Sequence, residues 1–398
     1  MKFINLMEVT GRVEIYKFDG SNWVQVGSSI DGENAGDSAG TSVALSSDGQ
    51  TVAIGENLWS SSKGRVRIFK FDGSNWTLVG LAIDGENAGD SAGTSVALSS
   101  DGQTVAIGES AWSTATGRVR IFKFDGSSWT LVGLAINGEN VGDTTGFSVA
   151  LNSDGQTVAI GEPNWDTSKG RTRVFKFNGS SWILVGLAIN GSNTGDLAGD
   201  SVALSADGQT VAVGEPYWLS GGNNGRVRIY AFDGSSWTLI GNTINGENGN
   251  DFVGDSVALS SDGTIVAIGE KGWLNGANNG RIRVFKSDGS NWLQLGSAIN
   301  GENADSAGVS IALSSNGGIV AFGEPLWSVN LGRVRVYKYP ISDGAAIQNH
   351  VLHFKPLNLS DLANPGAALE NMIPVYYLYL VATQKASGEF RSLTHIIG

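Results

Sequence analysis

The chain has 398 residues, a formal net charge of -12 and a sequence pI near 4.7. This acidity argues against nucleic-acid and anionic-membrane partners, because both are bound through clustered lysines and arginines. The absence of Cys excludes disulfides and thiolate chemistry. Gly is abundant, with 57 residues, and it separates short aromatic and β-branched runs, which predicts an all-β protein of many strands and tight turns.

The N-terminal residues are not expected to form a signal peptide, because Glu8 and Thr10 interrupt the apolar run. The longest apolar run, residues 372–383, has about half the length that a membrane-spanning helix needs. We therefore predict a soluble chain without membrane insertion. Its compartment is not defined by these features.

A repeat organises the chain. Residues 31–56 recur letter for letter as residues 84–109, and weaker copies follow. A Gly-Arg pair marks each unit and begins at Gly11, Gly64, Gly117, Gly170, Gly225, Gly280 and Gly332. We predict one domain over residues 1–398, with units 11–63, 64–116, 117–169, 170–224, 225–279 and 280–331, a partial unit 332–339 and a non-repeating tail 340–398.

Each unit carries four strand-like runs, which in the second copy are residues 65–71, 76–83, 94–98 and 104–108. An Asp-Gly pair separates the first two runs, and another separates the last two. Such pairs favour type I′ hairpin turns, in which both central residues have positive φ, so these runs are expected to pair antiparallel. Four strands in each of six or seven units predict a β-propeller.

The tail is expected to close the ring, because an open end would leave an unpaired hydrophobic face. We assign residues 351–357 to the outer strand of the sixth blade, and residues 374–383 and 389–397 to the inner pair of a seventh. The second of these runs ends in Ile-Ile-Gly, much as the second strand of a unit ends. Residues 11–18 and 23–30 would complete that blade. A six-bladed ring with a separate tail is the alternative.

The unit pattern Gly-x-Ser-Val-Ala-Leu, Asp-Gly-x-x-Val-Ala-Ile-Gly-Glu and Gly-Arg-Val-Arg-Ile-Phe resembles the FG-GAP repeat of integrin α-chain propellers and their microbial relatives, from Gly11 to Tyr339. The resemblance implies that Ser-Val-Ala-Leu is the innermost strand and the Trp run the outermost. It also implies an adhesion or ligand-recognition module at a cell surface or outside the cell.

The unit departs from the family at several places, and Gly-Ala-Pro, for example, becomes Gly161-Glu162-Pro163. The Phe-Gly pair is replaced, for example by Ala39-Gly40, and the Asp-rich calcium loop is missing. In its place Ser46-Ser47-Asp48-Gly49 supplies one carboxylate, whereas calcium takes about six to eight oxygen ligands. We therefore predict no metal site and no cofactor; a calcium site is the alternative that the family resemblance leaves open.

The twelve Trp residues form two ordered sets. The first set begins the fourth strand of each unit and is predicted to pack against the adjacent blade. Its members are Trp23, Trp76, Trp129, Trp182, Trp237 and Trp292.

The second set follows a repeated Glu as Glu-x-x-Trp, at the end of the second strand and hence on one rim. A rim Trp beside carboxylates and Asn is suited to stacking on a sugar ring and hydrogen-bonding its hydroxyls. The alternative is structural, with Trp packing between blades and Glu pairing with the Arg that opens the third strand. The candidate residues are Glu56, Trp59, Glu109, Trp112, Glu162, Trp165, Glu215, Trp218, Glu270, Trp273, Glu324 and Trp327.

No Ser-His-Asp set or phosphate-binding loop stands out, and the breaks in repeat symmetry are loop insertions and Lys271. The only His residues, His350, His353 and His395, lie in the tail. We predict that the chain is not an enzyme but a binding or adhesion module, with multivalent recognition of glycans or a protein partner. The alternative is a structural or assembly scaffold without a small ligand.

Overall fold

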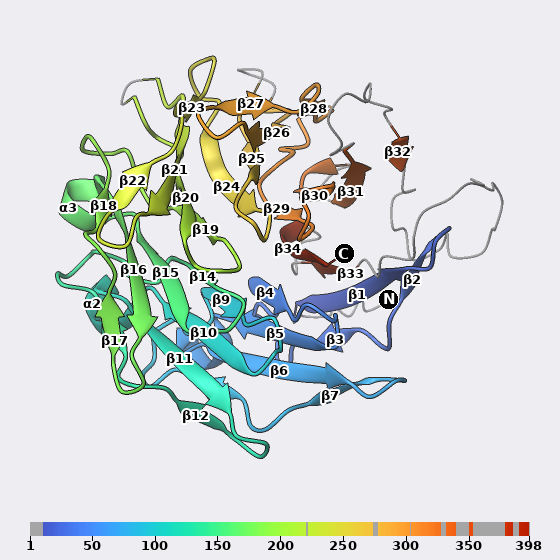
Figure 1. The fold of residues 1–398 in the computed structure, drawn as a ribbon. Helices are drawn as coiled ribbons and strands as arrows, with labels where there is room; N and C mark the ends of the chain where they lie inside the picture. Colours follow the sequence, from blue (N-terminus) through green and yellow to red (C-terminus); the bar gives the residue numbers. More distant parts are fainter. Residues whose placement is uncertain are drawn as a thin grey trace, which may run out of the picture.

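The computed structural model describes residues 11–219, 222–273, 278–302, 304–327, 332–339, 350–352, 379–384 and 390–397. Seven small antiparallel sheets stand side by side around one axis (Figure 1). Their innermost strands contact one another in a closed circle, in the order β4, β9, β14, β19, β24, β29, β34 and back to β4. The predicted seven-bladed β-propeller is therefore confirmed, and the six-bladed alternative is wrong.

Each blade has four strands from the axis outward, and most blades add a two-residue strand. The innermost strands are β4 (Ser42–Leu45), β9 (Ser95–Leu98), β14 (Ser148–Leu151), β19 (Ser201–Leu204), β24 (Val253–Leu259), β29 (Ile311–Leu313) and β34 (Phe390–Ile397). The second strands are β5 (Thr51–Glu56), β10 (Thr104–Glu109), β15 (Thr157–Glu162), β20 (Thr210–Glu215), β25 (Ile265–Glu270), β30 (Ile319–Glu324) and β33 (Tyr379–Gln384).

The third strands carry the repeated arginines. They are β6 (Arg65–Phe71), β11 (Arg118–Phe124), β16 (Arg171–Phe177), β21 (Arg226–Phe232), β26 (Arg281–Ser287), β31 (Arg333–Lys338) and β1 (Arg12–Phe18). The outer strands are β7 (Trp76–Leu78), β12 (Trp129–Leu131), β17 (Trp182–Leu184), β22 (Trp237–Leu239), β27 (Trp292–Gln294), β32 (His350–Leu352) and β2 (Trp23–Gln25). We number the blades 1 to 7 in the order of these lists.

The two-residue strands pair with the start of the third strands. They are β8 (Ile83–Asp84), β13 (Ile136–Asn137), β18 (Ile189–Asn190), β23 (Ile244–Asn245), β28 (Ile299–Asn300) and β3 (Ile30–Asp31). Short helical turns follow three of the second strands, and these are α1 (Trp59–Ser62), α2 (Trp112–Ala115) and α3 (Trp165–Ser168). No helix among the described residues is both long enough and apolar enough to cross a membrane.

Blade 7 contains strands from both ends of the chain, as predicted. β1 pairs antiparallel with β33, from Arg12 opposite Gln384 to Lys17 opposite Tyr379. β32 pairs with β31 as the outer strand of blade 6, whereas residues 353–357 of that predicted strand lie outside the described residues, as do 374–378 and 389. The order of the inner pair differs from the sequence pattern, because β33 occupies the second position and β34 is innermost. The Ile-Ile-Gly ending therefore predicted that this run is a strand, but it did not predict the position of the strand within the blade.

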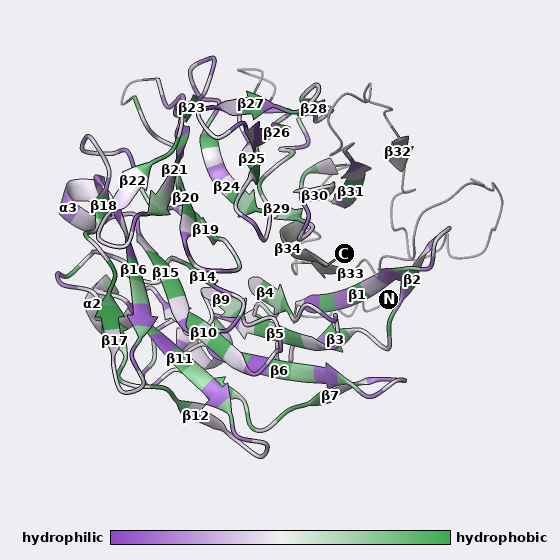
Figure 2. Cartoon of the chain, in the orientation of Figure 1, coloured by the Kyte–Doolittle hydropathy of each residue, from purple (hydrophilic) through white to green (hydrophobic). Residues whose placement is uncertain are grey.

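Apolar side chains point to both sides of each blade because neighbouring blades cover both faces. One cluster joins Val119 and Ile121 of blade 2 to Val158 and Ile160 of blade 3, and all four side chains are essentially fully buried. Figure 2 shows hydrophobic residues along the strands, interrupted by hydrophilic positions on strands such as β1, β6 and β11. Burial of each such side chain stabilises the fold by about 1.5 to 3 kcal/mol. Because these clusters join residues of adjacent blades, the hydrophobic core lies between the blades.

Glycines allow the inner strands of neighbouring blades to approach closely. A Cβ on Gly55 would lie 2.2 Å from the carbonyl oxygen of Gly93, so no other residue fits there without a shift of backbone. The hydroxyl of Ser42 donates a hydrogen bond of 2.7 Å to the same carbonyl. The Gly and Ser of the repeat thus join one blade to the next.

The first Trp set joins blades at their outer edges. The indole N–H of Trp129 donates to the carbonyl of Val79 in the preceding blade at 2.8 Å, and its ring lies 5.2 Å from that of Phe124. Gly80, with φ of 68°, interrupts the outer strand where this Trp packs. The predicted single fourth strand is therefore divided into β7 and β8, while its packing role is confirmed.

The Asp-Gly turns differ from the predicted type I′ geometry. Gly73 has φ of 103°, but Asp72 does not have a positive φ. Instead, Oδ1 of Asp72 accepts hydrogen bonds of 2.8 Å from the backbone N–H groups of Ser74 and Asn75. The Asp side chain therefore organises a four-residue turn, which is the local capping that Asp favours.

Candidate functional site

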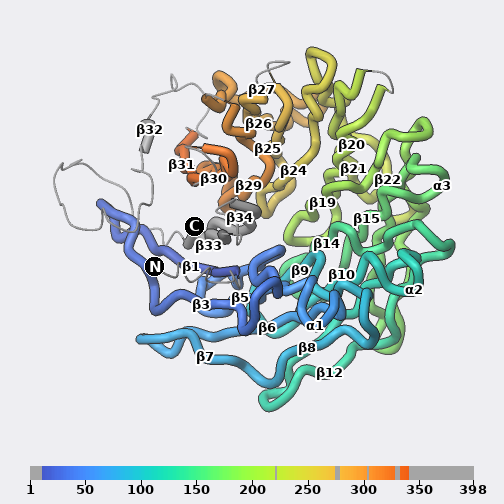
Figure 3. Tube along the Cα trace, turned by 180° about the vertical axis from the view of Figure 1, so that it is seen from behind, coloured from blue at the N-terminus to red at the C-terminus, as the bar shows by residue number. Residues whose placement is uncertain are grey.

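One side of the ring carries two kinds of loop, and we call it the loop face. The first kind, residues 110–117 in blade 2, follows the second strand and contains the Trp of Glu-x-x-Trp. The second kind, residues 85–94, connects one blade to the next. Figure 3 shows α1, α2 and α3 of the first kind succeeding one another around the ring. All twelve candidate residues lie on these loops or on the strand ends beside them.

The Glu of each pair is bound by two arginines of its own blade. Nε of Arg118 donates to Oε2 of Glu109 at 2.7 Å, and Nε of Arg120 donates to Oε1 of the same carboxylate. Nη1 of Arg118 also binds the exposed Glu86 of the loop that leads into this blade, at 3.0 Å. Burial raises the pKa of Glu109 against the lowering effect of the arginines, whereas Arg118 lowers the pKa of Glu86.

All six carboxylates are completely removed from solvent. Glu56, Glu109, Glu162, Glu215, Glu270 and Glu324 each have 0% exposure. A ligand at the surface cannot contact these oxygens without displacing the protein around them. The expected cross-strand Glu-Arg pairing is present. The buried carboxylates can influence a ligand at the surface only by positioning the arginines that they bind.

The Trp of each pair is half-buried and lies against the first of these arginines. The guanidinium carbon of Arg118 is 4.8 Å from the centroid of the Trp112 ring. The same contact occurs in all six copies at 4.8 to 5.2 Å. A cation over an indole contributes about 0.5 to 2 kcal/mol. The chain of contacts from Glu109 through Arg118 fixes the position of the indole.

The backbone after this Trp follows a left-handed turn. Ser113, Thr114 and Ala115 have φ of 49°, 59° and 60°, a conformation that costs about 1 to 2 kcal/mol for each residue with a Cβ. Hydrogen bonds hold the turn, including one from the N–H of Thr144 to the carbonyl of Ala115 at 2.8 Å. These residues are not Gly or Asn, so the sequence carried no signal for this turn.

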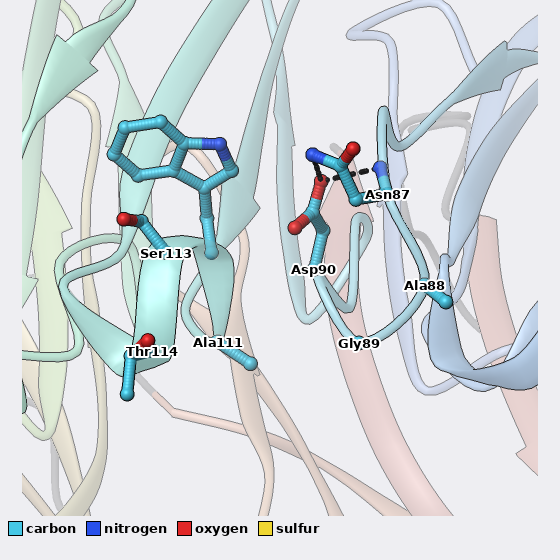
Figure 4. Close-up of a pocket in the computed structure, with 8 residues that line it drawn as sticks. Asn87, Ala88, Gly89, Asp90, Ala111, Ser113 and Thr114 are labelled. Carbon is cyan, nitrogen blue, oxygen red and sulfur yellow. Dashed lines mark hydrogen bonds between the residues drawn. The ribbon is translucent and has the colours of Figure 1, made fainter.

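A hollow of about 520 Å³ lies between this turn and the preceding inter-blade loop (Figure 4). The inter-blade side consists of residues 87–90, and the other side consists of residues 111–114 and includes Trp112. Asn87 donates to Oδ2 of Asp90 through its backbone N–H at 2.8 Å and through its amide at 3.4 Å. The buried Asp90 thus holds the loop in shape beside the indole. Within the described ranges no group of three or more His, Cys, Asp or Glu side chains could hold a metal ion.

Comparisons with known proteins support the fold. No family model matches the chain, and no curated protein matches it in sequence. The model is similar to a candidate 6-phosphogluconolactonase from Bacteroides uniformis, with 14% identity, 86% of this chain and 95% of that chain covered, and a TM-score of 0.57. It is also similar to a periplasmic gluconolactonase of Pseudomonas aeruginosa, with 14% identity, coverage of 85% and 94%, and a TM-score of 0.56.

Hydrazine synthase of Kuenenia stuttgartiensis is a further neighbour, with 16% identity, coverage of 81% and 80%, and a TM-score of 0.52. At these identities the likeness defines the class of fold, a seven-bladed β-propeller. The prediction that the chain is not an enzyme is overturned, because neighbours with this architecture include proteins described as lactonases. The sequence reasoning failed here because it searched only for known catalytic triads and phosphate-binding loops, whereas one fold can host many different active sites.

Proposed function

We propose that the chain is a ligand-binding β-propeller that recognises glycans at equivalent positions around its loop face. The observation that carries this proposal is the hollow beside Trp112, which is bordered by a fixed indole and by polar side chains. An indole offers a flat apolar surface to a sugar ring, and amide and hydroxyl groups hydrogen-bond sugar hydroxyls. The buried Glu of each pair is then a positioning residue rather than a ligand contact.

The repetition of the unit supports multivalent recognition. Six copies of the indole and arginine contact have nearly the same geometry, so the copies are expected to have similar, weak affinities. Linked weak sites bind a surface that displays many ligands more tightly than any single site does. Together with the FG-GAP-like unit, this favours adhesion to a glycan-bearing surface or to a glycosylated protein partner.

A glycan array with the intact chain, followed by calorimetric titration of an array-positive oligosaccharide, tests the proposal. Joint substitution Trp112→Ala and Trp165→Ala is expected to reduce the number of sites from six to four without unfolding the chain. Leu81→Ala with Leu134→Ala is the matched control, because these side chains are 83% and 82% exposed. A negative array, or unchanged stoichiometry in the double Trp variant, would contradict the proposal. A tight macromolecular complex without any response to sugars would favour the scaffold alternative.

A further inference from the structure

The loop face loses its symmetry between blades 4 and 5. The residue before the first Ser of the innermost strand is Thr41 or Thr94 in the first two blades, but it is Asp200 in blade 4 and Asp255 in blade 5. The residue after the repeated Glu is uncharged in the other copies and is Lys271 in blade 5. Three changes of charge therefore fall at one junction between blades.

The backbone brings the two aspartates to neighbouring positions. The hydroxyl of Ser201, which follows Asp200, donates at 2.7 Å to the carbonyl of Gly254, which precedes Asp255. Nζ of Lys271 forms an ion pair with Oδ1 of Asp255. The two carboxylates and the ammonium consequently share one end of β19 and β24.

An aromatic pair borders this cluster. The rings of Tyr217 and Phe252 meet edge to face with centroids 5.2 Å apart. Nζ of Lys271 lies 5.4 Å from the centroid of Phe252. In the first copies the positions of Tyr217 and Phe252 are held by small or aliphatic residues, such as Leu58 and Ser91. The junction therefore combines charge with an aromatic surface that the first blade does not have.

Asp200 is the member of the cluster without a partner. In the described part of the chain it accepts no side-chain hydrogen bond and forms no ion pair, while Lys271 is engaged by Asp255. Protein atoms surround Asp200 closely, yet part of its surface remains in contact with solvent. Burial, followed by the charge of Asp255, raises the pKa of Asp200 to about 7. Glu215 at the end of the adjacent β20 is neutralised by Arg226 and Arg228.

We propose that the junction of blades 4 and 5 binds a small organic ammonium ligand, whose cation pairs with Asp200 and whose carbon frame contacts Tyr217 and Phe252. Lys271 is already paired with Asp255, so the ionised form of Asp200 gains a counter-charge only when a second cation enters the cluster. A metal ion does not fit, because no described group has three suitable ligands. An aromatic face is a favourable neighbour for an organic cation and for its carbon frame.

The test uses benzylamine, which is an ammonium ion at neutral pH, and benzyl alcohol as its neutral analogue. We expect calorimetry to detect benzylamine but not benzyl alcohol, with about tenfold tighter binding at pH 8 than at pH 6, because only ionised Asp200 pairs with the cation. Binding should release a proton, seen as a dependence of the measured heat on the ionisation enthalpy of the buffer. Asp255, Lys271 and Tyr217 are the other titratable groups of the cluster.

Asp200→Asn is expected to abolish benzylamine binding, and Asp200→Thr, which restores the residue of the first blades, should do the same. Asp166→Asn removes an exposed carboxylate from the same face and should change nothing. Equal binding of the alcohol, no binding of benzylamine at pH 8, or full affinity in either Asp200 variant overturns the proposal. Glycan binding at the rim is expected to survive these substitutions, so the two sites are tested separately.

Discussion

The Glu-Arg-Trp contacts of the loop face and the cluster at the junction of blades 4 and 5 differ in charge balance. In blade 2 the charges of Arg118 and Arg120 are matched by Glu109 and Glu86. At the junction, Lys271 faces both Asp255 and Asp200. A desolvated charge is costly unless it is paired. The comparison indicates that the charges of the repeated contacts are balanced within the chain, whereas Asp200 at the junction has no counter-charge of its own among the described residues.

The largest expected change in the free energy of unfolding comes from breaking the Glu-Arg contacts of a single blade. Glu109→Gln keeps the shape of the side chain but leaves Arg118 and Arg120 buried without their shared counter-charge, so the free energy of unfolding should fall by about 3 to 5 kcal/mol. Urea denaturation measures this change. Glu86→Gln is the control, because Glu86 is 55% exposed and such pairs contribute less than about 1 kcal/mol. Similar small losses in both variants would show that the buried carboxylate does not hold the arginines.

Substitution of Asp200 in the junction cluster should raise the free energy of unfolding, in contrast to substitution of Glu109. The pKa of Asp200 is raised from its ordinary value to about 7 in the folded chain, so the folded state holds a proton that the unfolded state has lost. The stabilisation from this proton is complete below pH 4 and is lost as the pH rises to 7. Asp200→Asn removes this loss and should stabilise the chain by about 4 kcal/mol at pH 8 and very little at pH 4, because one pKa unit corresponds to about 1.4 kcal/mol.

Thermal denaturation of both proteins across this pH range measures the difference. Asp166→Asn serves as the control, because its carboxylate is 56% exposed and faces Lys169 only at 4.0 Å. The interpretation of Asp200 as a desolvated, unpartnered carboxylate would be wrong if the variant were less stable than the parent at pH 8. A pH-independent gain would assign the effect to packing instead of ionisation.

The fold could be predicted from the sequence because the repeat presents the same evidence several times. The spacing of the Gly-Arg pairs, the apolar runs and the turn residues all indicate a blade, and ring closure then requires the two ends to share a sheet. The order of β33 and β34 was not predictable in this way. The pattern of apolar residues in a strand shows which of its faces are buried, but not which strands lie beside it. The tail that contains β33 and β34 does not follow the repeat, so no other copy indicates their order.

The site was predictable in location but not in geometry. The repeated Glu-x-x-Trp placed both side chains on one rim, yet it did not show that Glu109 is fully buried or that Trp112 lies on Arg118. These features depend on Arg118 and Arg120 projecting from a neighbouring strand. The cluster at Asp200 was also missed, although Lys271 had been noticed as a break in symmetry. A comparison of all copies at the positions of Asp200 and Asp255 would have found it.

The smallest expected effect concerns the indole itself. Trp112→Leu keeps an apolar side chain beside Arg118 but removes the aromatic face, so the free energy of unfolding should fall by about 0.5 to 1 kcal/mol. Trp112→Phe retains an aromatic ring and should lose less. Because the Trp165 ring lies at the same 4.8 Å from its arginine, Trp165→Leu is expected to match Trp112→Leu in urea denaturation. Unequal losses in these two variants would show that the copies are not equivalent, and the proposed number of glycan sites would then fall below six.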